Sequence, residues 1–314
     1  MDLESLKTVL KTCIMISLFT LVADKMIFFV FNTISDEVYT GQSIGKLNHY
    51  LKVKDDLDLI VYGSSRANRC LNPDEVMKNS FNMGMDGRKL AYSATLMKLL
   101  PKDKNQLVLL HIDPDNAYDK NYSGRDIKAL GSKYNRIEIV KNEINRLKQN
   151  NILQTVFWSL SYNGSILGII KNYLMPKYDY KKFSGYEPFN VNAMQRKVLE
   201  NILKEKTPQL CQNDLILNKH YNRLLNELKR FCDENNKIII VFSSPKYNDT
   251  CKDDNLKFRQ LMKEKGFSFY DFTDYFRDNN KIEFWKDKTH LSREGAEIFS
   301  KKMKEILKPY VQSY

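Results

Sequence analysis

Residue types that mark metal, redox or fibrous proteins are scarce or badly spaced in this chain. Twelve glycines and eight prolines among 314 residues are too few for a fibrous repeat or a disordered chain, and there is no internal repeat. The five cysteines form no Cys-x-x-Cys pair, so the sequence predicts no metal site and implies no disulfide framework. Whether Cys232 and Cys251 pair is left open. Only four histidines are present, so a histidine beside other reactive side chains is informative.

The chain carries an excess of positive charge, with a formal net charge of +12 and an isoelectric point near 9.2. Such a protein can face nucleic acid, anionic lipid headgroups or an acidic polymer. Lysines are spread along the whole chain, and no recognisable nucleic-acid motif accompanies them. We therefore favour a solvated basic surface and expect no nucleic-acid partner. The alternative, a basic nucleic-acid binder, predicts duplex binding that falls steeply with salt.

The N-terminal region contains the longest apolar run. Residues 10–31 read LKTCIMISLFTLVADKMIFFVF, which is about the length that crosses a bilayer core. Asp24 and Lys25 lie well inside this run, where an ionisable group costs about 2.5–3.5 kcal/mol on insertion scales. We expect both side chains to lie toward one face, paired or snorkelling. The run predicts a membrane anchor in contact with lipid; the alternative is an amphipathic or buried helix.

Charges that flank the anchor predict its orientation. Lys7 precedes the run and Lys11 lies at its very start, whereas Asp36 and Glu37 follow it, which favours a cytoplasmic N-terminus. A cleaved signal peptide is disfavoured because the run is long and no small-x-small site follows it. We therefore expect a single-pass membrane protein whose folded domain is periplasmic or extracellular.

Three regions are predicted along the chain: the anchor at residues 1–35, a polar, irregular tether at residues 36–55, and one folded domain at residues 56–314. The run Ile238–Phe242 lacks alternation, as expected for a central parallel strand that is covered on both faces. Five strand-like runs are present in the domain: Leu57–Tyr62, Ser80–Met83, Leu107–Ile112, Lys237–Ser243 and Phe267–Phe272.

Helical patterns separate these runs. Apolar residues repeat at helix spacing over Tyr221–Cys232, and a last helix is expected to begin after Ser292, its N-cap, and to end at Pro309. Alternating strands and helices imply an α/β fold, a three-layer α/β/α sandwich with a mostly parallel, flavodoxin-like sheet.

The region between residues 119 and about 213 interrupts this rhythm. It shows helical and loop patterns but no convincing strand, and it is too long for an ordinary crossover, so we expect a mainly helical insertion that caps the active edge. Within it, lysines and tyrosines alternate in a way that suits sugar rings, an anionic polymer or headgroups. The alternative is an ordinary solvated loop. The residues of this candidate substrate surface are Lys171, Tyr173, Lys177, Tyr178 and Tyr180.

Two short stretches far apart in the sequence contain a possible catalytic triad. Gly63-Ser64-Ser65-Arg66 follows a predicted buried strand, so its serines lie at the carboxyl edge of the sheet, where ligands of open α/β sheets bind. Asp287 and His290 lie three residues apart just before a predicted helix. This spacing lets the carboxylate reach one imidazole nitrogen while the other faces a serine. Each stretch alone is a weak signal, since glycine-serine turns and capping aspartates are common.

Over residues 56–118 and 237–307 the chain resembles the SGNH, or GDSL, hydrolase superfamily, and more loosely its membrane-anchored branch that acts in cell-envelope polysaccharide acylation. In that family the first block reads Gly-Asp-Ser. The resemblance makes Ser65 the nucleophile and puts Ser64 in place of the family aspartate. The last block, Asp-x-x-His followed by Leu, matches Asp287 and His290 without departure.

The middle blocks of the family supply the oxyanion hole. By resemblance, the turn Asn82–Gly87 makes the N–H of Gly87 a donor beside that of Ser65, with Gly84 permitting the turn. The third block of the family puts an asparagine after the third strand. Here that strand runs into Asp113-Pro114-Asp115-Asn116, so Asn116 fits only if the loop is longer. Otherwise Arg66 or Asn82 would assist, and loss of one donor typically costs about 10²–10³-fold in turnover.

The resemblance implies acyl transfer without a cofactor or metal. The expected protein is a serine esterase or O-acyltransferase that uses Ser65, His290 and Asp287 on acyl, preferentially acetyl, esters of extracellular polysaccharide or wall polymer. A membrane O-acyltransferase is a candidate partner. The alternative, favoured by the altered third block and by Ser64, is a catalytically weak or inactive SGNH-like envelope protein that binds glycan or an acyltransferase. Asp113 and Asp115 lack companion ligands for a metal.

Overall fold

The computed structural model describes residues 2–205, 209, 211 and 214–311. Part of the expected insertion, including its end near 213, therefore lies outside the described residues. The chain divides into two compact units, each built from two stretches of sequence. Unit 1 comprises Met1–Asn48 and Lys128–Tyr180, and unit 2 comprises His49–Ile127 and Lys181–Tyr314. The N-terminal helix thus folds with the central part of the insertion.

Unit 2 is built around an all-parallel sheet of five strands in the order β2-β1-β3-β4-β5. All five predicted strands are present, and their ends lie within two residues of the expected positions. A doubly wound sheet with this order has its topological switch point between β1 and β3. The strands are β1 Leu59–Tyr62, β2 Ser80–Asn82, β3 Gln106–His111, β4 Lys237–Ser243 and β5 Ser268–Asp271.

Helices of unit 2 bury both faces of this sheet, so the central strands β1 and β3 are apolar at nearly every position. The helices form two groups: α13 packs with α3 and α4, and α11 packs with α5 and β4. The helices and 3₁₀ turns of unit 2 are α3 Ser65–Cys70, α4 Pro73–Val76, α5 Leu90–Met97, α6 Pro114–Ala117, α10 Ala193–Lys204, α11 Lys219–Glu234, α12 Lys252–Glu264, η4 Arg277–Asn279, η5 Ile282–Phe284 and α13 Arg293–Val311.

Two expectations about the helices of the domain are tested by this structure. Ser292 does cap α13, because its hydroxyl accepts a hydrogen bond from the Gly295 N–H at 3.3 Å. The helix does not end at Pro309, however, and continues to Val311. Pro309 removes one hydrogen bond of the last turn and its ring crowds the preceding turn, and the helix continues for only two more residues.

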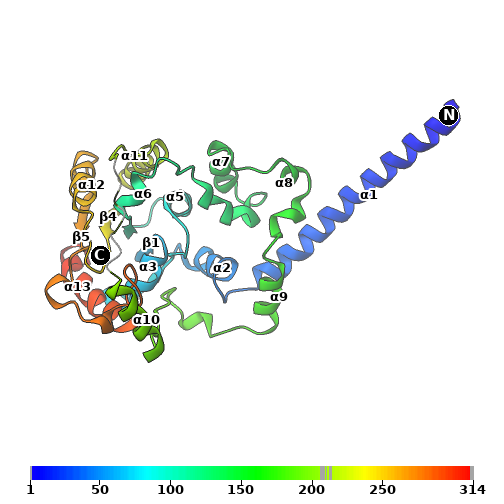
Figure 1. Cartoon of the computed structure of the whole chain (residues 1–314). Coiled ribbons are helices and arrows are strands. Elements are labelled where there is room, and N and C mark those ends of the chain that lie inside the picture. The colour runs from blue at the N-terminus through cyan, green and yellow to red at the C-terminus, as the bar shows by residue number, and fades with distance from the viewer. Residues whose placement is uncertain (1, 206–208, 210, 212–213, 312–314) are drawn as a thin grey trace. The chain divides into compact units, whose positions relative to one another are not determined.

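Unit 1 is helical in the residues described. Its longest element is α1, which Figure 1 shows as one continuous helix in blue. Within the part of the chain that the structure describes, α1 is the one helix long and apolar enough to cross a membrane, a property shared by signal sequences. The elements of unit 1 are α1 Leu3–Asp36, α7 Glu138–Arg146, α8 Ile152–Val156, η2 Trp158–Tyr162 and α9 Ile166–Leu174.

A small apolar core holds unit 1 together, formed by Phe28 of α1, Tyr162 and Ile169 with two residues that follow α1. Asp24 and Lys25 are paired, as expected, with Nζ of the lysine 2.8 Å from the carboxylate. Burial on α1 begins at Asp24, so only the first two-thirds of the helix is free on all sides.

The expectation of an irregular tether at residues 36–55 is wrong for half of that range, which forms the helix α2, Ile44–Val53. The polar composition of residues 36–55 had indicated an irregular segment. Leu47 and Tyr50, one turn apart, are both buried, which gives this short helix an apolar side despite its charges. Two short 3₁₀ segments complete the chain: η1 Arg125–Lys133 and η3 Tyr180–Lys182.

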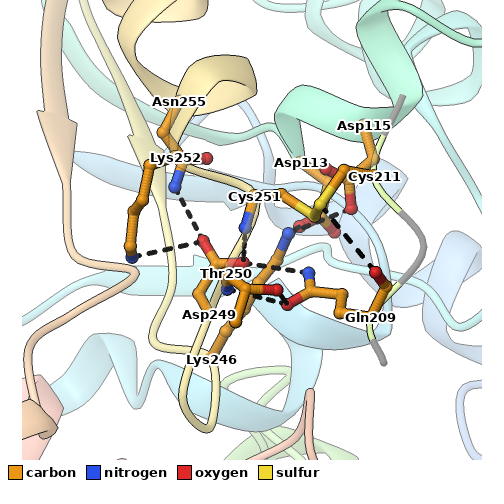
Figure 2. Close-up of a disulfide and its surroundings, with 10 residues drawn as sticks. All are labelled: Asp113, Asp115, Gln209, Cys211, Lys246, Asp249, Thr250, Cys251, Lys252 and Asn255. Carbon is orange, nitrogen blue, oxygen red and sulfur yellow. Dashed lines mark hydrogen bonds and ion pairs between the residues drawn. A yellow bond between two sulfur atoms is a disulfide. The ribbon is translucent and has the colours of Figure 1, made fainter. Parts of the chain in front are cut away.

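A disulfide joins Cys211 to Cys251 in unit 2 and closes a loop with a sequence separation of 40 residues (Figure 2). Cys232 is instead a buried free thiol, so it is not the partner of Cys251. The neighbouring Asp249 is buried and accepts hydrogen bonds from Gln209 and Asn255. The bridge therefore fastens the end of the insertion to the segment that follows β4.

Candidate active site

The candidate nucleophile lies on a tight turn between β1 and α3. Gly63 has a φ of +146°, and a Cβ at this position would lie 2.7 Å from the Cβ of His111, so only glycine fits. Ser64 is the N-cap of α3, and its hydroxyl accepts a hydrogen bond from the Arg66 N–H. Ser65 is therefore the first residue of the helix, where N–H groups have no partner inside the helix.

The structure brings together the three residues that the sequence predicts as a triad. Ser65 Oγ lies 2.8 Å from His290 Nε2, although the residues are 225 positions apart. On the other side of the imidazole, Nδ1 lies 3.0 Å from both carboxylate oxygens of Asp287. A hydroxyl, a base and an orienting carboxylate thus follow one another at hydrogen-bond distance, which is the geometry that activates a serine.

A short closed loop before α13 holds the acid and the base. Trp285 is fully buried and pairs with Leu291 across this loop. Thr289 donates two hydrogen bonds to Asp287 Oδ1, from its N–H at 2.8 Å and from its hydroxyl at 2.9 Å. Burial alone would raise the pKa of Asp287, but hydrogen bonds from His290 and Thr289 and the charge of His290 lower it to about 2. The carboxylate is therefore charged at neutral pH.

The second block, after β2, is bonded to the helix that carries the nucleophile. Asn82 is fully buried, and its amide nitrogen donates to the carbonyl oxygens of Ala67 and Leu71 at 2.8 and 2.7 Å. Its amide oxygen accepts from the Gly84 N–H at 2.9 Å. These bonds use the whole amide, so Asn82 positions the turn and does not take the direct role in the oxyanion hole that we had considered for it.

Gly87 lies on the same turn with a φ of +70°. A Cβ here would meet no atom within 4 Å, so the turn is open on that side. Asp86, the residue before it, accepts hydrogen bonds from Asn68 Nδ2 at 3.0 Å and from the Arg69 guanidinium, both in α3. The two expected backbone donors, at Ser65 and Gly87, therefore belong to two segments that are bonded to each other.

The third block contains an ion pair where the family has an asparagine. Asp113, the second residue after β3, pairs with the guanidinium of Arg66. The other end of that guanidinium donates to the carbonyl oxygens of Ser244 and Pro245 at 2.5 and 3.0 Å. Burial lowers the pKa of Arg66 to about 10, which still leaves it charged at neutral pH. Because both terminal nitrogens are bonded, Arg66 holds the loops after β3 and β4 and is not an evident oxyanion donor.

Asn116 is not brought to the triad by any hydrogen bond found among the residues described. It lies in α6, and its N–H donates to the Asp113 carbonyl oxygen at 3.0 Å. Its expected role therefore gains no support, and the backbone N–H groups of Ser65 and Gly87 remain the candidates for the oxyanion hole.

Lys246 is a residue of this region that the sequence analysis missed. It follows β4 and is buried, with Nζ 3.0 Å from Asp115 and 3.7 Å from Asp113. The two carboxylates are thus neutralised by cations, and among the residues described no cluster suits a metal ion. His111 is buried and lies 3.1 Å from the Ser244 hydroxyl; burial, then the nearby cations, holds its pKa well below the usual range, consistent with a neutral core residue.

The part of the insertion that belongs to unit 2 reaches the triad, which the sequence did not show residue by residue. Phe189 makes an edge contact with the His290 ring, with 5.7 Å between the ring centroids. The guanidinium of Arg69 lies over the Phe189 ring, 4.6 Å from its centroid. The backbone carbonyl of Glu187 accepts from Arg69 at 2.8 Å. This segment therefore forms one wall beside the imidazole.

The candidate substrate surface falls elsewhere. Lys171, Tyr173, Lys177, Tyr178 and Tyr180 all belong to unit 1, whereas the triad belongs to unit 2. Lys171 and Tyr173 are exposed, and Tyr180 stacks on Tyr39 with 4.6 Å between ring centres.

A comparison of the chain with protein-family models and with curated proteins finds no match. The likeness to the SGNH superfamily therefore remains a resemblance of motifs. The structure itself establishes a mixed α/β protein with an all-parallel sheet of five strands, an apolar N-terminal helix, and a Ser–His–Asp arrangement. Ser65 follows β1, one of the two strands that flank the switch point, where open α/β sheets bind ligands.

Proposed function

We propose that this chain is a membrane-anchored serine esterase or O-acyltransferase of the SGNH type. One observation carries the proposal: Ser65 Oγ is 2.8 Å from His290 Nε2, and Nδ1 of the same ring is 3.0 Å from Asp287. Serine, base and carboxylate in this order are the machinery of acyl transfer. The strand order and the helices on both faces of the sheet fit the three-layer α/β/α sandwich that this class would require.

The proposed reaction begins when His290 Nε2 takes the hydroxyl proton of Ser65 and the Oγ attacks the ester carbonyl carbon. The negative oxygen of the tetrahedral intermediate would accept hydrogen bonds from the N–H groups of Ser65 and Gly87. Collapse then breaks the bond to the alcohol, which leaves with the proton from His290. Asp287 keeps the imidazole in the required tautomer and stabilises its charged form.

The acyl-serine must then be released to an acceptor. Water, activated by His290, would complete ester hydrolysis, whereas a sugar hydroxyl in the same place would complete an O-acyl transfer. We propose acyl esters of an extracellular polysaccharide or wall polymer as substrates, with acetyl as the first group to test. An exported location is supported by the apolar helix α1 and by the disulfide between Cys211 and Cys251, since such bonds persist in oxidising compartments.

Labelling with a fluorophosphonate tests the proposal without knowledge of the substrate. The full chain in detergent micelles should gain one adduct in an intact-mass measurement, because the probe reports an activated serine. Ser65→Ala and His290→Ala should each abolish the adduct. Ser64→Ala is the matched control: it removes the neighbouring hydroxyl and costs about 1 kcal/mol of helix capping, but should still be labelled.

The same experiment separates the proposed enzyme from its alternative. A folded wild type without an adduct, or an adduct that survives in Ser65→Ala, would remove the assignment. The first of these results would favour an SGNH-like envelope protein that binds glycan or an acyltransferase partner, and the charged pair in place of the third-block asparagine is the feature that supports this alternative.

A further inference from the structure

Unit 1 exposes an apolar surface that the proposed chemistry does not use. Outside α1, the large apolar side chains at the surface of unit 1 are concentrated in α8, α9 and the residue after α9, a stretch of fewer than thirty residues. Exposed apolar surface of this kind marks contact with a protein, a ligand or a membrane. The exposed side chains of this face, which we call the α8–α9 face, are Ile152, Leu153, Val156, Leu167, Ile170, Tyr173, Leu174 and Met175.

Helix α9 has two adjacent apolar sides. Ile166 and Ile169 pack into the core of unit 1. Leu167, Ile170 and Leu174 follow the spacing i, i+3 and i+7, which puts them on a second side that is exposed, with Leu167 at 84% exposure. A helix at the surface of a water-soluble protein would carry polar residues on its exposed side. The second side therefore requires an apolar neighbour.

The α8–α9 face is attached to α1 at a defined level of that helix. Asp24 accepts hydrogen bonds from the N–H groups of Trp158 and Ser159 at 2.9 and 3.0 Å. Lys25 Nζ lies 4.4 Å above the Trp158 ring and also donates to the carbonyl oxygen of Val156. Helix α1 also packs against η2 and α9, and Figure 1 shows α9 at the C-terminal end of α1. The α8–α9 face is thus joined to α1 next to the exposed apolar part of that helix.

The length of α1 puts this junction near a bilayer boundary. Its 34 residues span about 51 Å at 1.5 Å per residue, whereas a hydrocarbon core is about 30 Å thick. A membrane that encloses the part of α1 before Asp24, which is exposed except at the half-buried Leu21 and Ala23, leaves the last third of the helix outside. Trp158 and Lys25 would then lie where tryptophan and lysine are enriched, at the membrane–water interface.

Charge at this face points to lipid. Lys171 and Lys177 are exposed within or just after α9, among the apolar residues and beside the exposed Tyr173. Apolar side chains with lysines on their rim are typical of segments that lie in the interface of anionic membranes. We propose that the α8–α9 face inserts shallowly into the phospholipid bilayer that α1 crosses, and that Lys171 and Lys177 contact anionic headgroups.

This inference reassigns the lysine–tyrosine stretch that the sequence suggested as a substrate surface. It does not depend on the chemistry of Ser65. Unit 1 would be held by two contacts with the bilayer, a spanning helix and an interfacial face, and would not hang from a single helix.

Depth-dependent quenching tests the inference on the full chain in vesicles of phosphatidylcholine with phosphatidylglycerol. A nitrobenzoxadiazole label on Leu167→Cys, in a Cys13→Ser background, should lose about half of its emission to lipids that carry a doxyl group near the headgroup, as expected for insertion of about 5–10 Å. Labelled Cys13 of the unsubstituted chain is the reference inside the bilayer. Met194→Cys in α10 is the matched control, since Met194 is 78% exposed and Leu167 84%.

The outcomes are decisive in both directions. Quenching at position 167 that clearly exceeds quenching at 194 supports the inference. A label at 167 that responds only to aqueous acrylamide, or no more to doxyl lipid than the label at 194, overturns it in favour of an uncovered face or a protein partner. If Leu167→Cys does not fold, brominated lipids should still quench Trp158 in the unsubstituted chain more than the buried Trp285.

Discussion

Unit 2 buries charged groups beside its candidate active site, whereas unit 1 exposes a group of large apolar side chains on α8 and α9. Around the candidate active site Arg66 and Lys246 are buried against the carboxylates of Asp113 and Asp115. On the α8–α9 face, Leu167 and its neighbours lie at the surface. Each arrangement costs stability in an isolated, water-soluble fold. We propose that the first serves chemistry at a fixed site and that the second serves contact with a lipid bilayer.

The largest effect is expected from the carboxylate of the triad, because unit 2 must do chemistry if the contrast is correct. Asp287→Asn keeps the shape but no longer selects the required imidazole tautomer. We expect the rate of fluorophosphonate labelling to fall by about 10⁴-fold. Asp233→Asn, at an exposed helix position, should leave the rate unchanged. Equal rates for Asp287→Asn and wild type would mean that His290 does not act as an oriented base.

The buried ion pair offers the next largest effect. Asp113→Leu leaves the guanidinium of Arg66 without its carboxylate in a buried place, and we expect a loss of about 3–5 kcal/mol in the free energy of unfolding. Urea unfolding can be followed by Trp285 alone in a Trp158→Phe background, since the chain has only these two tryptophans.

The matched control for that change is Asp233→Leu, which breaks an exposed pair with Lys229 within α11. Its effect should stay near or below about 0.5 kcal/mol. If Asp113→Leu lowered the free energy of unfolding no more than this control, the charge of Arg66 would not depend on Asp113 for its burial.

The disulfide of unit 2 should have a smaller effect. Loop-closure entropy for a bridge with a separation of 40 residues predicts up to about 4 kcal/mol, and measured values are commonly about 2–4 kcal/mol. Cys211→Ser, or a reducing agent added to wild type, should therefore lower the free energy of unfolding by that amount. Cys13→Ser, at an exposed position, should not. A stability that is indifferent to reductant would show that the bridge does not fasten the end of the insertion.

Local sequence patterns predicted the sheet well. Unbroken apolar runs such as Ile238–Phe242 reflect burial on both faces, and this requirement acts residue by residue. The triad was also predictable, because a glycine turn after a strand and an Asp-x-x-His before a helix each have a fixed local geometry. Ser65 and His290 are 225 positions apart in the sequence, and the contact between them becomes apparent only in the folded structure.

The elements that escaped prediction depend on partners distant in the sequence. The segment at residues 36–55 is polar, and the burial of Leu47 and Tyr50 explains why its second half forms the helix α2. Lys246 and Phe189 carry no local signal, since a buried lysine needs the carboxylates of another loop and an aromatic wall needs the imidazole it covers. The pairing of Cys211 with Cys251 likewise cannot be read from spacing.

The smallest expected effect concerns acid stability at the triad. Because the pKa of Asp287 in the folded chain is about 2, below its ordinary 3.8, its hydrogen bonds contribute stability above about pH 4 that is lost as the pH falls toward 2. The side chain is 45% exposed, so solvent screening keeps the contribution below about 1 kcal/mol. The difference in unfolding free energy between wild type and Asp287→Asn should therefore shrink between pH 4.5 and about pH 2.5. A difference that grows with acid would mean that folding raises the pKa of Asp287 and does not lower it.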